Sequence, residues 1–287
     1  MIGAAVQLPL PARPSVVVAL LTPFAEDGTI DAGTLREHVA FLLDAGVDAL
    51  MPCGTTGEGP LLDEDEAAAV VETAVAAADG RVPVLAHVGR TSTGATIRLA
   101  RRAIGNGAAA VSAVVPYYYD LGDEQVLAHY RALMDAAGTT PALAYNIPAR
   151  TGNDLAPDTV RTLAADGLAG IKDSTKSLDR HREYLRLAGP RFAVFMGSDG
   201  LVADALRAGA AGCVSALANV RPDLLVRLTR AVTERRDGEA EALEGEISAL
   251  RAELSRGPAL VALKQALSER LAAEGVRYPS ALRPPLG

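Results

Sequence analysis

Residues 167–175 read GLAGIKDST, and this stretch contains the pattern from which the fold follows. A glycine that can end a helix comes first, a short apolar run typical of a strand buried on both faces follows, and polar residues end the run. The same order recurs in GVDALM (46–51), GAAAVSAVV (107–115) and GAAGCVS (209–215). These stretches indicate a repeated unit of one helix and one buried strand.

The repeated unit can be followed along most of the chain as eight buried strands, each with a helix after it. Eight such units favour an α/β fold, a (β/α)8 TIM barrel, over an open doubly wound sheet. No GxGxxG sequence follows the first strand to favour that alternative. The strands are expected at 16–21, 46–51, 82–88, 107–115, 141–145, 167–172, 192–196 and 211–215, and the helices at 31–45, 63–79, 93–106, 123–137, 157–165, 178–188, 200–208 and 222–235.

The two ends of the chain lie outside this repeat. Residues 1–15 are rich in proline and lack periodicity, so we expect an N-terminal arm there. The barrel is assigned to residues 16–236. Residues 237–287 are expected to form a C-terminal helical extension, with helices at 238–256 and 258–274. No linker divides the chain.

Composition narrows the classes of protein to consider. Of the 287 residues, 49% are hydrophobic and 22% are charged, which suits a sizeable core, and the net charge of −7 predicts binding neither to nucleic acid nor to an anionic membrane. Two cysteines make no disulfide framework. Because we see no signal peptide and no apolar run long enough to span a bilayer, we expect a cytoplasmic protein. No residues have metal-ligand spacing, so no metal is expected.

A lysine stands where the sixth expected strand ends. Lys172 follows apolar residues and precedes the polar residues 173–175, so its amine should be partly buried. A partly desolvated amine is more readily a free base, which is nucleophilic towards carbonyl carbon. The structural alternative is a lysine that extends its amine to solvent.

Polar residues also follow other expected strands, at the end of a barrel where active sites lie. PCGTTGE (52–58) offers a tight glycine turn, two hydroxyls and free N–H groups that suit a carboxylate. PYYY (116–119) follows the fourth strand, and YNIPARTG (145–152) brings a tyrosine suited to proton relay and an arginine suited to a carboxylate. GSDG (197–200) follows the seventh strand, where a phosphate site is an alternative. Together with the lysine, these groups fit Schiff-base chemistry on a 2-keto acid.

Four stretches occur with the residues, and in the order, of a known family. They are GTTGE (54–58), PYY (116–118), YNIPARTG (145–152) and GIKDST (170–175). In them the chain resembles the dihydrodipicolinate synthase and N-acetylneuraminate lyase family of pyruvate-dependent class I aldolases. The resemblance implies a TIM barrel and a lyase that needs no cofactor, because the enzyme forms a covalent Schiff base with its substrate pyruvate. Weaker matches are LTPF (21–24), GSD (197–199) and GCVSALANV (212–220).

The resemblance also implies a role for each matching side chain. Lys172 would form the Schiff base, and Tyr145 would shuttle protons to and from it. Thr55 would join a hydroxyl relay with Tyr145 and Tyr118. Tyr118 would reach in from a neighbouring subunit, which implies a homo-oligomer, a dimer or a dimer of dimers. The residues assigned to substrate binding are Thr56 and Gly54 at the pyruvate carboxylate, Arg150 at the carboxylate of the second substrate, and Val214 in the wall of the site.

The resemblance leaves more than one reaction open. GTTGE (54–58) and Arg150 resemble the branch that condenses pyruvate with aspartate semialdehyde in lysine biosynthesis, which is our first prediction. LAHVGRTST (85–93) and Tyr119 resemble the branches that cleave a sugar-derived 2-keto acid of the N-acetylneuraminate or 2-keto-3-deoxygluconate type. A barrel that binds a keto acid without turnover is a third possibility. In every case the expected partners, apart from other copies of the chain, are small molecules.

Overall fold

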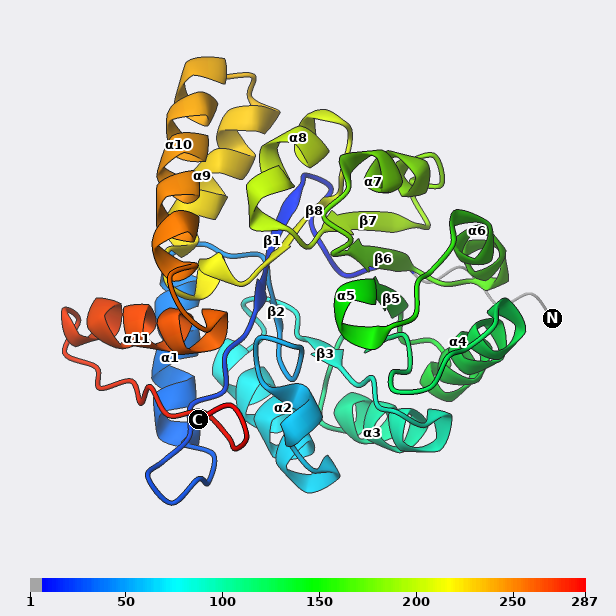
Figure 1. Ribbon diagram of the computed structural model, residues 1–287, viewed down its shortest axis with the longest axis horizontal. Coiled ribbons are helices and arrows are strands. Elements are labelled where there is room, and N and C mark those ends of the chain that lie inside the picture. The colour runs from blue at the N-terminus through cyan, green and yellow to red at the C-terminus, as the bar shows by residue number, and fades with distance from the viewer. Residues whose placement is uncertain (1–6) are drawn as a thin grey trace.

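The computed structural model describes residues 7–287, in which eight parallel strands form a barrel with helices around it (Figure 1). The hydrogen-bonded order of the strands is β2-β1-β8-β7-β6-β5-β4-β3, and a parallel bridge between Leu50 and Val84 joins β2 to β3. This confirms the predicted TIM barrel. The strands are β1 Ser15–Ala19, β2 Ala49–Met51, β3 Leu85–His87, β4 Ala110–Val114, β5 Ala142–Asn146, β6 Gly170–Asp173, β7 Ala193–Met196 and β8 Gly212–Ser215.

Helices connect the strands and form the outer layer. Some of these helices begin at a residue whose side chain accepts a hydrogen bond from an N–H of the first turn. At the start of α2, for example, the Asp63 side chain accepts from the Glu66 N–H while the Glu66 side chain accepts from the Asp63 N–H. The helices are α1 Ala32–Asp44, α2 Glu64–Ala78, α3 Thr93–Gly105, α4 Asp123–Ala137, α5 Pro148–Thr151, α6 Pro157–Asp166, α7 Leu178–Leu185, α8 Val202–Arg207, α9 Pro222–Thr233, α10 Asp237–Leu254 and α11 Ala259–Ala272, with 3-10 turns η1 Gly59–Leu61, η2 Asp199–Leu201 and η3 Leu217–Asn219.

Several boundaries differ from those expected. β2 begins at Ala49 rather than at residue 46, because Gly46 has a φ of +82° and belongs to the turn after α1. The helix expected at 200–208 is divided into η2 and α8. The four residues of α5 follow β5 in a stretch where no helix was predicted, because one helical turn is too short to show periodicity.

The first described residues lead directly into the barrel. β1 begins at Ser15, one residue earlier than expected, because the Ser15 N–H donates to the Ala211 carbonyl at 2.9 Å. Just before it, the Arg13 guanidinium pairs with the Asp48 carboxylate at 2.5 Å. The expected arm also includes residues 1–6, which lie outside the described residues.

Alternation along the strands determines which side chains enter the barrel. Val17 belongs to the cluster inside the barrel, whereas Val16 and Val18 pack against the helices outside it. On β6, Ile171 packs outward, so Lys172 points inward. The register places Lys172 beside Tyr145 on β5. The barrel therefore brings both side chains to its interior.

The C-terminal extension covers one side of the barrel. α10 packs against α9 and η2, and α11 lies beside α1, where the Arg270 guanidinium stacks 5.1 Å from the centre of the Phe41 ring (Figure 1). The last residues then run back towards α2, and the C-terminus lies there. The tail is thus joined to the first part of the barrel.

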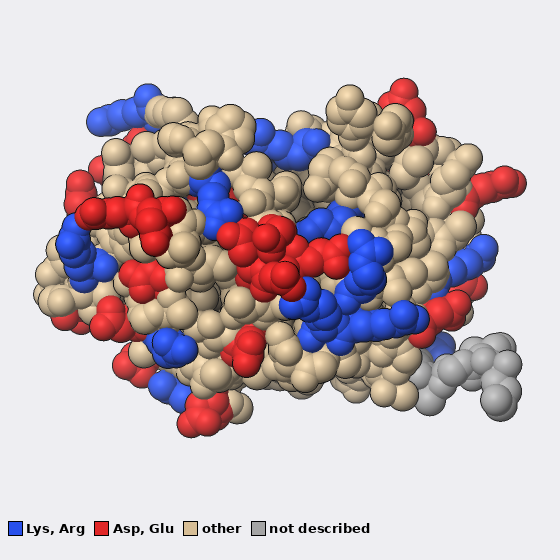
Figure 2. Space-filling view, turned by 90° about the horizontal axis from the view of Figure 1, so that it is seen from below, with Lys and Arg blue, Asp and Glu red and all other residues tan. Residues whose placement is uncertain are grey.

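Charges of both signs are interspersed on the face seen in Figure 2. The α2–α3 side of the molecule carries ion pairs such as Arg98–Glu64 at 2.6 Å and Arg102–Asp65 at 2.7 Å. Within residues 7–287, no helix combines the length and the apolar character needed to cross a membrane.

Candidate active site

Lys172 lies at the carboxyl end of β6 with only 5% of its surface exposed. Its Nζ sits 4.0 Å from the centre of the Tyr145 ring. On the β7 side the neighbour is Gly197, where a Cβ atom would lie 3.1 Å from Lys172 Cε and 2.1 Å from Ser174 Oγ. A glycine is therefore needed at residue 197 to leave room beside the lysine.

Tyr145 lies between two other residues predicted for the site, Lys172 and Thr55. Its hydroxyl lies 3.4 Å from the Thr55 hydroxyl. Burial by itself would raise the pKa of the phenol, but the Lys172 ammonium and hydrogen bonds with Thr55, Ser174 and Lys172 outweigh burial, so the pKa is lower than usual. A phenol that ionises more readily and lies beside an amine can give and take protons at a substrate bound there.

The turn after β2 presents the predicted carboxylate-binding groups. Gly54 is buried, whereas Thr55 and Thr56 are partly exposed. The turn is tightly closed, because the Gly59 N–H donates to the Gly54 carbonyl at 3.0 Å and a Cβ at Gly59 would lie 1.7 Å from the Cys53 carbonyl oxygen. Its hydroxyls and free N–H groups suit a carboxylate.

His87 supports this group from inside the barrel, and no role was predicted for it. Its Nε2 accepts the Val114 N–H at 3.1 Å, so its Nδ1 carries the proton and donates to the Cys53 carbonyl at 3.1 Å. Its ring also meets the Tyr145 ring edge-on at 5.9 Å. Burial, followed by the charges of Arg90 and Lys172, lowers the pKa of His87 to about 3. His87 is therefore a neutral residue that packs beside Tyr145. The sequence signal for its inward position was its place two residues after Leu85, because side chains two apart on a strand face the same side.

Tyr118 is not part of this group within one chain. It is 84% exposed, has a φ of +86°, and packs edge-on against Tyr119 at 5.0 Å. Among residues 7–287 its hydroxyl bonds neither to Thr55 nor to Tyr145. The relay predicted for it therefore requires a second chain.

The other two predicted residues differ in their exposure to solvent. Arg150 is exposed on α5, and its guanidinium has no acidic partner within 4 Å among the described residues. Val214 on β8 is buried in the interior cluster, in register with Val17 on β1. Arg150 is thus accessible to a ligand, whereas Val214 packs within the barrel.

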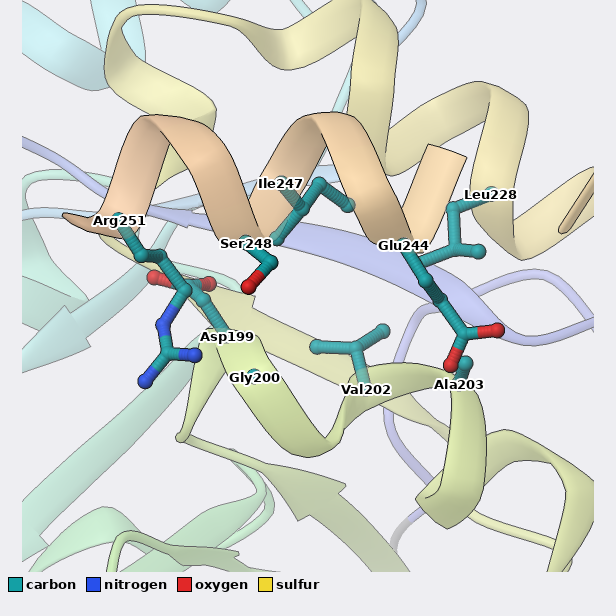
Figure 3. A pocket seen from close by; sticks show the side chains of 9 residues that line it. All are labelled: Asp199, Gly200, Val202, Ala203, Leu228, Glu244, Ile247, Ser248 and Arg251. Atoms are coloured by element: carbon teal, nitrogen blue, oxygen red, sulfur yellow. The ribbon is translucent and has the colours of Figure 1, made fainter. Parts of the chain in front are cut away.

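A cavity of about 220 Å³ lies beside the end of β7, between η2–α8 and α10 (Figure 3). Asp199 lies at one end of it and accepts the Leu217 N–H at 3.3 Å. Burial raises the pKa of Asp199, although Ser215, Leu217, Arg251 and Lys172 oppose the shift. Arg251 reaches in from α10 over Gly200, and the sequence predicted no contact between these two residues.

Across residues 7–287, no group of three or more His, Cys, Asp or Glu side chains is placed to hold a metal ion. Cys53 and Cys213 are buried free thiols whose pKa values are raised by burial, Cys53 to about 12. Neither thiol is a candidate nucleophile.

Comparison with known proteins adds an independent line of evidence. The family model described as Dihydrodipicolinate synthetase family matches residues 13–287. An uncharacterized DapA-like lyase of Halobacterium salinarum is 41% identical over 256 residues, covering 89% of this chain and 84% of the relative. A 4-hydroxy-tetrahydrodipicolinate synthase of Methylococcus capsulatus is 38% identical over 265 residues, covering 92% and 91%.

Two solved structures extend the comparison to the fold. Dihydrodipicolinate synthase from Aquifex aeolicus superposes with a TM-score of 0.88 at 32% identity, over 96% of this chain and 92% of the other. A variant of Sulfolobus solfataricus 2-keto-3-deoxygluconate aldolase superposes with a TM-score of 0.86 at 26% identity, over 95% and 90%. Both the synthase and the aldolase therefore share this architecture.

Proposed function

Because the chain belongs to the dihydrodipicolinate synthetase family, whose members are pyruvate-dependent lyases of the class I aldolase type, we propose that it is a 4-hydroxy-tetrahydrodipicolinate synthase. In this reaction the enzyme condenses pyruvate with aspartate semialdehyde. The observation that carries the proposal is the buried Lys172 amine, 4.0 Å from the Tyr145 ring, whose hydroxyl reaches Thr55. A keto-acid-binding protein without turnover needs no such nucleophile.

The proposed reaction begins at the ketone of pyruvate. Lys172 Nζ attacks C2, and the carbinolamine oxygen leaves as water after Tyr145 protonates it, which gives a protonated imine. The imine withdraws electrons from C3, so a proton leaves C3 for the Tyr145 oxygen and an enamine forms. C3 of the enamine then bonds to the aldehyde carbon, and Tyr145 returns its proton to the new alkoxide. The amino group of the former semialdehyde then attacks C2 and displaces Lys172 Nζ, which closes the product ring, and the proton released goes back to the Tyr145 oxygen.

Two further groups complete the proposed site. Thr56 and the N–H groups of the turn at Gly54 hold the pyruvate carboxylate, because Thr56 is partly exposed in the turn after β2 and successive N–H groups of a tight turn can bind an anion. Arg150 takes the carboxylate of the second substrate. Its guanidinium is exposed, lacks an acidic partner among the residues described, and has the planar fork that matches a carboxylate.

The test is borohydride reduction in the presence of pyruvate, followed by peptide mass mapping. We expect a reduced pyruvyl adduct on Lys172, and we expect aspartate semialdehyde added before the reductant to discharge it. Arg150→Ala is expected to retain the adduct but to need a concentration of semialdehyde about tenfold higher or more for discharge, as the loss of a charged hydrogen bond predicts. An adduct that the semialdehyde does not discharge would contradict the synthase assignment.

Cleavage of a sugar-derived 2-keto acid is the second candidate. The observation that favours it is Asp199 after β7, whose Oδ2 accepts the Leu217 N–H at 3.3 Å while its Oδ1 has no hydrogen-bond partner among the described residues and can accept a hydroxyl group. In the same reduction experiment, discharge by glyceraldehyde but not by aspartate semialdehyde would favour this aldolase reaction. The two candidates share Lys172 and differ in the aldehyde.

Tyr118 and Tyr119 support a further proposal about assembly. Their rings are 84% and 70% exposed in the single chain. Neighbouring large aromatic side chains with this exposure are typical of a surface that another protein chain covers. We propose that they pack against a second copy of the chain and that Tyr118 thereby joins the Thr55–Tyr145 pair of its neighbour. Sedimentation velocity is expected to show a dimer or a dimer of dimers, and a monomer at micromolar concentration would contradict the proposal.

A further inference from the structure

Glu58 is the last residue of the GTTGE turn, and the proposed mechanism gives it no role. Its side chain points away from the site, yet its backbone is part of the turn. The Glu58 N–H donates to the Thr55 carbonyl at 3.3 Å, and Glu58 itself has a φ of +57°. Because these residues form one closed turn, a displacement of Glu58 moves Thr55 as well.

The C-terminal tail holds the Glu58 carboxylate from both sides. Lys264 on α11 places its Nζ 2.6 Å from Oε1, and the Arg283 backbone N–H donates to Oε2 at 2.8 Å. The same Nζ donates to the Ala281 carbonyl at 2.6 Å and lies 4.4 Å from the centre of the Phe24 ring. The Glu58 and Lys264 side chains are both fully buried.

A second contact fixes the tail where it meets Glu58. The Arg283 side chain donates to the Glu66 carboxylate on α2 and to the Gly28 carbonyl, at 3.0 Å and 2.7 Å. Its guanidinium lies 4.7 Å from the centre of the Phe24 ring. Residues 281–283 are therefore attached to the loop after β1 and to α2, which follows the turn.

Stability alone does not explain a buried ion pair at this position. Two charges taken out of water lose their hydration, and an apolar pair of similar volume often stabilises a fold equally well. Burial indeed lowers the pKa of Lys264, against the opposing effect of Glu58. What these contacts add over an apolar pair is direction, because Lys264 Nζ lies 2.6 Å from Oε1 while the Arg283 N–H donates to Oε2, so both carboxylate oxygens are held relative to the tail.

We propose that the C-terminal tail is part of the substrate site, because Lys264 and Arg283 position the pyruvate-binding turn through Glu58. Glu58 and Lys264 are thus positioning residues for the pyruvate carboxylate and do not touch the reacting atoms. This inference rests on the proposed function, in which Thr55 and Thr56 belong to that turn. It predicts that weakening the attachment lowers affinity for pyruvate and leaves the chemistry at Lys172 largely intact.

Three variants separate positioning from folding. Glu58→Gln removes the carboxylate charge and leaves the buried Lys264 ammonium without an anionic partner, which can unfold the chain. Glu58→Gln/Lys264→Met removes both charges and should restore stability. Glu58→Asp keeps both charges and shortens the reach of the carboxylate by one methylene. Glu269→Gln is the matched control, because Glu269 is an exposed charge on the same helix as Lys264 and has no ion pair within 4 Å among the described residues.

The measurement is the rate of borohydride trapping at Lys172 as the concentration of pyruvate is raised. In the double variant we expect the half-saturating concentration to rise about tenfold or more, as expected for a misplaced charged hydrogen bond, with the maximal rate changed less than about threefold. Glu58→Asp should show a smaller rise and Glu269→Gln none. Trapping with acetone, which has the ketone but no carboxylate, should be unchanged in every variant.

The outcomes distinguish this inference from the proposed function. If the wild-type chain forms no adduct on Lys172, the proposed function itself fails. If the wild type is trapped and the folded double variant saturates at the same pyruvate concentration, the tail does not position the turn. An equal loss with acetone and pyruvate would assign the residues a general structural role and would also overturn the inference.

Discussion

Replacing Lys172 with alanine is expected to abolish borohydride trapping of pyruvate and to lower kcat/KM by about 10⁴-fold or more, which corresponds to about 5.5 kcal/mol of transition-state stabilisation. The physical reason is that alanine has no amine to form the imine, and without the imine the C3 proton of pyruvate is not acidic enough to leave. The fold should remain, because Lys172 makes no ion pair within 4 Å among the described residues.

The chain offers unusually clean controls for this experiment, since it contains only three lysines. Lys176 is exposed just after β6, and Lys264 is committed to the buried pair with Glu58. Lys176→Ala is expected to be trapped as the wild type is. Trapping that survives in Lys172→Ala, with the adduct mapped to another lysine, would remove Lys172 from the mechanism.

Replacing Tyr145 with phenylalanine is expected to lower kcat by about 10²- to 10³-fold, the size usual for the loss of a general acid–base. The ring would still pack beside Lys172 and His87, so pyruvate should still be trapped, only more slowly. Tyr130→Phe is the matched control. Tyr130 is another buried tyrosine, but its hydroxyl donates to the Ala113 carbonyl behind the barrel wall, so kcat should be retained.

The pH dependence provides a second measurement for Tyr145. Because its pKa is lower than usual, the phenol loses its proton at a lower pH than an ordinary tyrosine. Steps that need the protonated phenol should therefore slow as the pH rises through that lowered pKa, and this alkaline limb should disappear in Tyr145→Phe. An identical alkaline limb in the variant would assign it to another group.

Much of the site was predictable because it follows from local sequence. Lys172 and Tyr145 each stand at the end of a short apolar run, Thr55 lies in the turn after another, and parallel strands bring their carboxyl ends to one end of a barrel. The repeat thus predicted both the architecture and the meeting of residues that are far apart in sequence. The contact of Lys172 with the Tyr145 ring follows from the register of β5 and β6.

Features that depend on distant partners were not predictable in the same way. The position of His87 on its strand predicted an inward side chain, but its hydrogen bonds with Cys53 and Val114 connect β3 to two other segments of the chain. Glu58 meets residues of the tail that the sequence indicated only as helix and loop. The short helix α5 was not predicted, because a single helical turn is too short to show the periodicity of a helix. In each case the missing information was a tertiary contact.

The attachment of Glu58 to the tail has a consequence for how the enzyme is made. A ribosome delivers Glu58 early, whereas its partner Arg283 comes 225 residues later. All eight strands can therefore leave the exit tunnel and assemble before the residues of the tail that hold the turn have been synthesised. Under the proposed function, a chain that ends after β8 would therefore lack both residues that hold Glu58, and its pyruvate-binding turn would not be attached to the tail.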